Sequence, residues 1–162
     1  MINHKQNAVT IEENVVKLLK DKGLVIATAE SCTGGLIGAT IVNVSGASSV
    51  FHEGYITYSN EAKMKLLGVS SQTLDTFKAV SKETAAEMAA GGASRSGADV
   101  CIAVTGVAGP SVEDDKPVGL VYIGCFYKGK VTVRQFDFSG DRQQIRNASV
   151  NEALKLVISC IE

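Results

Sequence analysis

The stretch TAESCTGG at residues 28–35 is the point around which the sequence is organised. It follows the apolar run 24–27, which has the length of a buried strand, and it precedes the uncharged run 36–42, which we interpret as a buried helix. A strand, a polar turn and a helix therefore meet at Ser31. Unpaired N–H groups at a helix start favour an anion or a developing oxyanion, and two glycines let a ligand approach the backbone. An ordinary helix cap explains the same residues, so the stretch by itself leaves both interpretations open.

Length and charge indicate one globular domain. The chain has 162 residues, 45% of them apolar, and a formal net charge of −1, which is not the basic footprint of a nucleic-acid-binding protein. The first residues lack the apolar core of a signal peptide, and no apolar run approaches the roughly 18–20 residues that cross a bilayer. We therefore predict a cytoplasmic protein with neither a membrane nor a nucleic-acid partner.

The cysteines and histidines do not suggest a metal site. The two histidines have no partner at metal-ligand spacing, and the four cysteines are widely separated without a CxxC pair. We interpret the cysteines as free thiols of a reducing compartment. They are Cys32, Cys101, Cys125 and Cys160.

Helices and strands alternate along most of the chain. A capping box at Thr10 and Glu13 opens the first helix, and Gly23 ends it. Strands are predicted at about 24–28, 50–58, 99–105, 118–126 and 131–138, and further helices at about 34–43, 60–67, 81–97 and from Asp141 onward. This order favours an α/β fold, a three-layer α/β/α sandwich around a mixed, partly parallel sheet. We expect a single domain over residues 1–162, in which residues 1–8 form a flexible N-terminal segment and the polar loop 111–116 is mobile.

Two predicted strands end in loops that contain glycine. The first ends at Ser31 and the central one at Thr105-Gly106. If these strands are parallel neighbours, both loops line one crevice at the carboxyl edge of the sheet. Neither loop is a dinucleotide-binding or P-loop motif.

A serine nucleophile needs a base, and neither histidine is well placed to supply one. Lys63 is a candidate, because desolvation lowers the pKa of a lysine toward neutrality, and Tyr58 is expected to face the same crevice. A solvated surface lysine is the commoner outcome for such a residue. Cys32 is a competing nucleophile, although a cysteine beside a strand is more often a small core residue.

Two arginines stand at the start of the last predicted helix. Arg142 and Arg146 are spaced i, i+4 and therefore share one side of the helix. Cations there oppose the helix dipole, so an anion held between them, a phosphate above all, would explain their position. A solvated helix face is the alternative explanation.

Four motifs in order resemble the CinA C-terminal domain family, whose enzymes are nicotinamide-nucleotide amidohydrolases. They are TAESCTGG at 28–35, YSNEAK at 58–63, VTGVAGP at 104–110 and KPVG at 116–119. The resemblance runs from about residue 8 to the end, and it is to the stand-alone form, without the molybdopterin-binding-like domain of longer members. The segment SVEDDK at 111–116 departs from the family by lacking the glycines often seen after Gly-Pro. The resemblance therefore does not supply its contacts with the substrate.

The resemblance implies hydrolysis of the carboxamide of nicotinamide mononucleotide to nicotinate mononucleotide and ammonia, without a cofactor or metal, by a homodimer or other homo-oligomer. Ser31 would be the nucleophile, Lys63 would take its proton, and Tyr58 would orient or relay it. Backbone N–H groups around Thr33–Gly35 would hold the oxyanion. The expected substrate-binding residues are Thr33, Gly34, Gly35, Ser48, Thr105, Gly106, Arg142 and Arg146.

Two other functions fit the same sequence. One is a non-catalytic module that uses the glycine loops and arginines to sense a nucleotide. The other is an amidase with a different phosphorylated or acidic substrate. Only an enzyme requires both Ser31 and Lys63.

Overall fold

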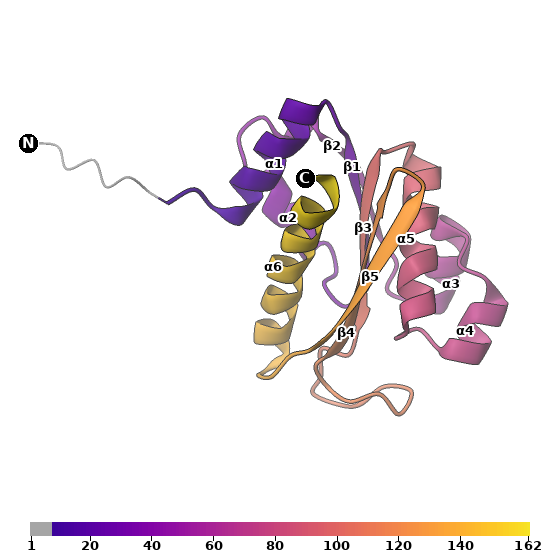
Figure 1. Ribbon diagram of the computed structural model, residues 1–162. Helices are drawn as coiled ribbons and strands as arrows, with labels where there is room; N and C mark the ends of the chain where they lie inside the picture. The colour runs from indigo at the N-terminus through magenta and orange to yellow at the C-terminus, as the bar shows by residue number, and fades with distance from the viewer. Residues whose placement is uncertain (1–7) are drawn as a thin grey trace, which may run out of the picture.

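Five strands form one mixed sheet in the computed structural model, which describes residues 8–162 (Figure 1). The segment predicted to be flexible falls almost wholly on residues 1–7, outside the described residues. The strand order is β2-β1-β3-β4-β5. The strands are β1 (Ile26–Glu30), β2 (Phe51–Ile56), β3 (Val100–Gly106), β4 (Leu120–Tyr127) and β5 (Lys130–Asp137).

The sheet is partly parallel, as the sequence predicts. β1 runs parallel to both β2 and β3, whereas β4 is antiparallel to both β3 and β5. Glu30, at the end of β1, pairs with Val104 of β3, so the loops that follow β1 and β3 lie side by side. β1 corrects the sequence-based boundaries, because it begins at Ile26 and continues to Glu30 instead of covering residues 24–28. All five of its residues are buried, which fits a strand with a parallel neighbour on each side.

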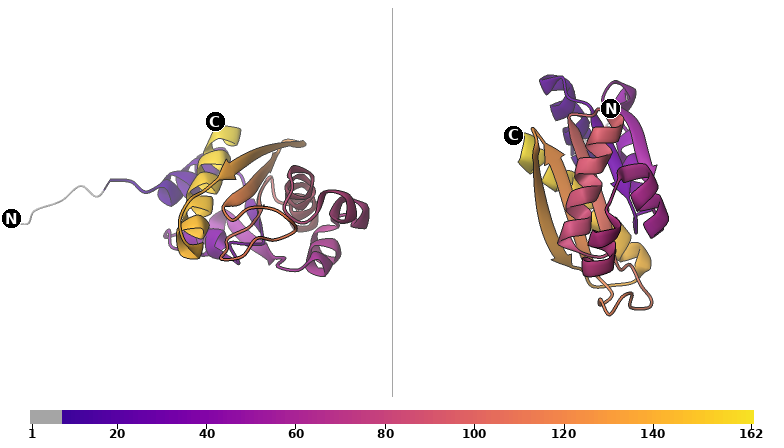
Figure 2. Two further views of the ribbon diagram at one scale, coloured as in Figure 1. Left: turned by 90° about the horizontal axis from the view of Figure 1, so that it is seen from below. Right: turned by 90° about the vertical axis from the view of Figure 1, so that its right-hand side faces the viewer.

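Helices cover both faces of the sheet, which confirms the three-layer prediction (Figure 1 and Figure 2). On one face lie α1 (Ile11–Lys22), α2 (Leu36–Val42) and α6 (Arg142–Ile161). On the other lie α3 (Asn60–Ala62), the single wide turn η2 (Lys63–Leu67), α4 (Ser71–Phe77) and α5 (Lys82–Ser96). A short helical turn, η1 (Ala47–Ser49), precedes β2. None of the helices in residues 8–162 combines the length and apolar character that spanning a bilayer requires.

Local capping sets several helix ends. Capping boxes form at Thr10 before α1 and at Asp141 before α6, and Gly23 ends α1 in a left-handed conformation, as the sequence predicts. Ser59 caps α3, with its Oγ accepting from the Ala62 N–H at 3.1 Å. α4, which begins after a Ser70 cap, was not predicted from the sequence.

Side-chain alternation along the strands builds two unlike cores. On β3, Ile102 and Val104 face α1, α2 and α6 in a cluster of large aliphatic residues. Cys101 and Ala103 face α5 in a cluster that is rich in alanine. Small residues on this second side bring the helix close to the sheet.

The close approach of α5 depends on glycines. A stripe of small residues on this helix, which includes Ala85 and Gly92, is buried. A Cβ atom at Gly124 of β4 would lie 2.8 Å from the Ala85 carbonyl oxygen. A Cβ atom at Gly91 would lie only 1.8 Å from the carbonyl oxygen of Leu67, at the end of η2. Gly91 therefore lets η2, the turn that begins at Lys63, dock on α5.

We expect Gly91→Ala to destabilise the protein, although alanine is the better helix former by about 1 kcal/mol. The added methyl overlaps the Leu67 carbonyl, so α5 and η2 must separate. Overpacking of this kind costs about 1–3 kcal/mol, measured as the free energy of unfolding in urea. Ser94→Ala, at an exposed position of the same helix, is the control and should change stability by less than about 0.5 kcal/mol. A Gly91→Ala protein as stable as the control would contradict the packing argument.

Candidate active site

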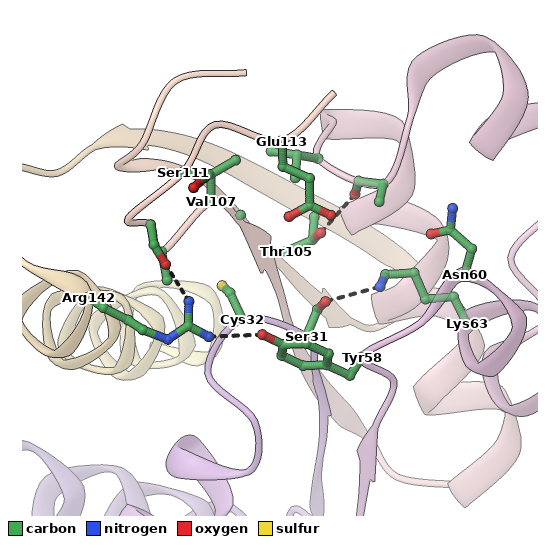
Figure 3. A pocket seen from close by; sticks show the side chains of 15 residues that line it. Ser31, Cys32, Tyr58, Asn60, Lys63, Thr105, Val107, Ser111, Glu113 and Arg142 are labelled. Carbon is green, nitrogen blue, oxygen red and sulfur yellow. Dashed lines mark hydrogen bonds between the residues drawn. The ribbon is translucent and has the colours of Figure 1, made fainter. Parts of the chain in front are cut away.

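The fold brings Ser31 and Lys63 together. Ser31 follows β1 directly, and its backbone N–H donates to the Val104 carbonyl at 3.0 Å, which ties it to β3. Lys63 is the first residue of η2, and its Nζ lies 3.0 Å from the Ser31 Oγ (Figure 3). Both side chains are buried, Lys63 to 1% exposure. Lys63 is thus not the solvated surface lysine that its residue type would favour.

The amine of Lys63 has two oxygen partners and no counter-ion. It donates to the Thr57 carbonyl at 2.8 Å as well as to Ser31, and it takes part in no ion pair within residues 8–162. Burial lowers the pKa of Lys63, and the nearby acidic groups of Glu113, Cys32 and Glu61 oppose this in part. Desolvation therefore favours the neutral amine, which is the form that acts as a base.

A pocket opens beside this pair. Its walls come from the end of β1, the segment around Tyr58 to Lys63, the end of β3 and the loop that follows it (Figure 3). Thr105 and Gly106 line it, as the sequence analysis expects. The Thr105 Oγ donates to the Ala79 carbonyl at 2.7 Å, so this hydroxyl is already engaged within the protein.

Tyr58 lines the same pocket but turns away from Lys63. Its side chain is 62% exposed, and its hydroxyl accepts a hydrogen bond from Arg142 Nη2 at 2.8 Å (Figure 3). Arg142 Nη1 also donates to the Gly109 carbonyl at 2.6 Å. The expected proton relay through Tyr58 is not formed, because the Tyr58 hydroxyl is hydrogen-bonded to Arg142 at the rim of the pocket.

Arg142 and Arg146 do not form a joint clamp. Arg146 lies one turn further along α6, about 6 Å along the axis, and is not among the pocket residues. Its Nε donates to the Cys32 carbonyl at 3.2 Å and its Nη2 to the Thr33 carbonyl at 2.8 Å. The expected joint phosphate site is therefore not formed: Arg146 braces the loop after β1, and of the two arginines only Arg142 faces the pocket.

The N-terminus of α2 is occupied by the protein's own carboxylate. Glu30 is 1% exposed, and its side chain accepts from the N–H groups of Gly35 and Ile37 at 3.0 Å each and from Gly38 at 2.9 Å. The Gly34 N–H donates to the Ser31 carbonyl at 3.0 Å. The N–H groups of Gly34 and Gly35 are therefore not free for an oxyanion, which corrects the sequence-based assignment.

Thr33 and Ser48 also lie outside the pocket. Thr33 is fully buried, and its Oγ has no hydrogen-bond partner among the described residues. Ser48 lies in η1 before β2, where Ile26 at the start of β1 donates to the Val50 carbonyl at 2.7 Å. Ser48 therefore lies near the amino end of β1, whereas Ser31 follows its carboxyl end, so Ser48 does not contact the pocket.

Several pocket residues were not predicted. Asn60, Ser111 and Glu113 line it, and Glu113 points inward from the polar loop (Figure 3). The charged run within residues 111–116, directly after Gly109-Pro110, was the sequence signal that could have indicated Glu113 as a pocket residue. Cys32 also faces the pocket, but burial raises the pKa of its thiol to about 12, so it is a poor nucleophile at neutral pH.

Comparisons with known proteins agree with this architecture. The family model of the CinA C-terminal domain matches residues 8–161. A CinA-like protein of Kosmotoga olearia is 54% identical over 149 residues, which are 91% of this chain but only 36% of the relative. The chain thus spans about a third of that relative's length.

Solved structures match over nearly the whole chain. The competence/damage inducible protein CihA of Agrobacterium tumefaciens is 40% identical, with a TM-score of 0.91 and 94% of each chain covered. A CinA superfamily protein of Klebsiella pneumoniae is 32% identical, with a TM-score of 0.92, covering 96% of this chain and 98% of its own.

We expect Glu30→Gln to destabilise the protein by about 2–3 kcal/mol in urea unfolding. The amide loses the negative charge at the α2 N-terminus and turns an NH₂ group toward backbone donors that the carboxylate now accepts from. Glu83→Gln, an exposed acidic residue in the first turn of α5, is the matched control and should cost less than about 1 kcal/mol. Equal losses for the two variants would show that Glu30 acts only as an ordinary surface charge.

Proposed function

The chain belongs to the CinA C-terminal domain family, and we propose that it is an amidohydrolase that releases ammonia from the carboxamide of nicotinamide mononucleotide. The observation that carries this proposal is the buried Lys63 amine, 3.0 Å from the Ser31 hydroxyl at the wall of a pocket. A module that only bound a nucleotide would have no need of a desolvated amine beside a hydroxyl, so the pair favours catalysis over sensing.

In the proposed reaction, neutral Lys63 takes the proton of Ser31 while the Oγ attacks the carboxamide carbon. Thr57 accepts one N–H of the amine at 2.8 Å, which leaves the nitrogen lone pair able to face the serine hydroxyl. The resulting ammonium then protonates the departing amine, and ammonia leaves. Water hydrolyses the acyl-enzyme to the acid and restores Ser31.

The developing oxyanion needs donors that are still free. Glu30 engages Gly35, and Ser31 engages Gly34. Within the described residues, the backbone N–H groups of Cys32 and Thr33 form no hydrogen bond with another residue. Cys32 directly follows the nucleophile and lines the pocket, whereas Thr33 does not, so we assign the oxyanion contact to the Cys32 N–H. A contact of this kind is worth about 3–4 kcal/mol in the barrier.

Two charged groups suit the two ends of this substrate. Arg142, held at the rim by Gly109 and Tyr58, is placed to bind the phosphate. Glu113 faces the interior, where its carboxylate would lie near the positively charged pyridinium ring. A cationic ring and an anionic phosphate on one ligand match this pair of opposite charges.

Replacing Ser31 by alanine should lower the kcat for ammonia release from nicotinamide mononucleotide by about a thousandfold or more. The nucleophile is lost, while a buried hydroxyl leaves little volume behind. Ser111→Ala, which removes another hydroxyl of the same pocket, is the control and should keep most of the activity. Activity of Ser31→Ala above about a tenth of wild type would contradict the nucleophile assignment and direct attention to Cys32. Nucleotide binding without turnover by the wild type would favour the sensing module.

The pH dependence of kcat/KM should show an acid limb set by Lys63. Activity requires the neutral amine, so it rises as pH increases through the lowered pKa of Lys63. The negative charge of Glu113 raises that pKa, so Glu113→Gln should move the limb to lower pH. Asp115→Asn, in the same loop but not among the pocket residues, is the control and should leave the limb in place. A shift to higher pH in Glu113→Gln would exclude Lys63 as the titrating base.

A further inference from the structure

A pair of cysteines lies at the end of the sheet that is opposite the end where Ser31 lies. Cys125 is near the end of β4, and Cys160 is in the last turn of α6. Both line a second pocket, together with Tyr127, Lys128, Lys130, Thr132 and Ser159. Cys125 pairs across the sheet with Ile102, four residues before the end of β3, so this pocket is separate from the candidate active site.

The fold places the two cysteines at the same pocket and against the same core. Cys125 lies in the aliphatic core that α6 covers, its thiol donates to the Phe126 carbonyl at 3.9 Å, and Cys160 packs against the same core. Its cross-strand neighbour is Thr132, which lines the same pocket as Cys160. Arg134 of β5 donates to the Ser159 Oγ at 3.3 Å and so holds the last turn of α6 over the hairpin. This contact at Ser159 therefore holds Cys160, the next residue, over the strands that carry Cys125 and Thr132.

The charged groups around Cys160 are cationic. Lys128 and Lys130 come from the β4–β5 hairpin, Arg134 comes from β5, and no carboxylate is among the pocket residues. Hydrogen bonds from Cys125 and Thr132, with the charges of Arg134 and Lys130, lower the pKa of the Cys160 thiol. Burial and the helix C-terminus act in the opposite direction. The hydrogen bond to Cys160 and burial raise the pKa of Cys125, so the thiolate resides on Cys160.

We propose that Cys160 and Cys125 form a peroxide-sensitive thiol pair that closes to an intramolecular disulfide. Cys160 is the residue that reacts with peroxide, because it is partly exposed at a pocket lined by lysines. Cys125 is only 1% exposed and is the thiol that then forms the disulfide with Cys160. The other two cysteines lack this arrangement. Cys101 is fully buried on the α5 side of the sheet, and Cys32 lies in the candidate active site.

The chemistry requires only a small peroxide as the oxidant. The Cys160 thiolate attacks one peroxide oxygen, so an S–O bond forms, the O–O bond breaks and hydroxide leaves as water after protonation. The sulfur of Cys125 then attacks the sulfenic sulfur of Cys160. An S–S bond forms, the S–O bond breaks, and the hydroxyl leaves as water with the proton of Cys125. Two thiols and one hydrogen peroxide thus become one disulfide and two waters.

The test treats the full chain with hydrogen peroxide, followed by thiol titration and peptide mapping by mass spectrometry without reduction. Wild type should lose two of its four thiols and show one linked peptide pair, Cys125 with Cys160, which dithiothreitol reverses. Cys101→Ala is the control and should still form that pair. Cys160→Ser and Cys125→Ala should each abolish it, with circular dichroism showing that both variants remain folded.

A second variant keeps the test decisive if a cysteine variant unfolds. Arg134→Gln removes a cation beside Cys160 without touching either sulfur, and it should slow the loss of thiols. Oxidation of Cys160 to sulfinic or sulfonic acid without a link to Cys125 would overturn the proposal. So would a disulfide between two copies of the chain, or thiol loss at an unchanged rate in Arg134→Gln.

Discussion

The buried amine of Lys63 is the constraint on which the candidate site depends. A charged ammonium at this position would be costly to desolvate, and no carboxylate pairs with it among the described residues. The neutral amine is satisfied by one carbonyl oxygen and one hydroxyl, those of Thr57 and Ser31. Every element around it must therefore hold its place closely. The wide turn of η2, the glycine that lets it dock on α5, and the end of β1 all serve this geometry.

The sequence around Ser31 fitted either a helix cap or a reactive site. The structure contains both, on neighbouring residues: Glu30 caps α2, and Ser31 contacts Lys63. Successive side chains of a strand point to opposite faces of the sheet. Glu30 therefore points toward α2 and accepts from its first N–H groups, while Ser31 points toward η2 and Lys63. Because Glu30 satisfies the helix start, the Ser31 hydroxyl is not needed as a cap. The same alternation separates the large aliphatic core from the alanine-rich one.

The two ends of the sheet have different chemical characters. At the carboxyl ends of β1 and β3, loops supply hydroxyls, an amine and charges of both signs around one pocket. At the other end, the β4–β5 hairpin and the C-terminus of α6 gather cations around a pair of thiols. The rigid sheet between them positions both groups, because side chains on strands are held more precisely than those on loops.

Periodicity and local motifs were sufficient for the architecture. The capping boxes at Thr10 and Asp141, the apolar strands and the alternation of strands with helices are local signals, and they predicted the three layers and the mixed sheet. Local signals fail where propensity is weak. α4 has no strong apolar period, and the end of β1 was set by pairing with β3 instead of by its own residues.

The sequence by itself determined the class of fold, the crevice between the loops after β1 and β3, and Ser31 and Lys63 as residues worth pairing. Only the tertiary structure decided what each polar group contacts. Arg142 and Arg146 lie on the same side of α6, one helical turn apart. Because of this separation, Arg142 lines the pocket, whereas Arg146 binds backbone carbonyls of the loop after β1. The Tyr58 hydroxyl binds Arg142 and not Lys63. Cys160 and Cys125 line one pocket although they are 35 residues apart in the chain. Hydrogen bonds act over about 3 Å, and spacing along a chain does not determine position at that scale until the whole fold has formed.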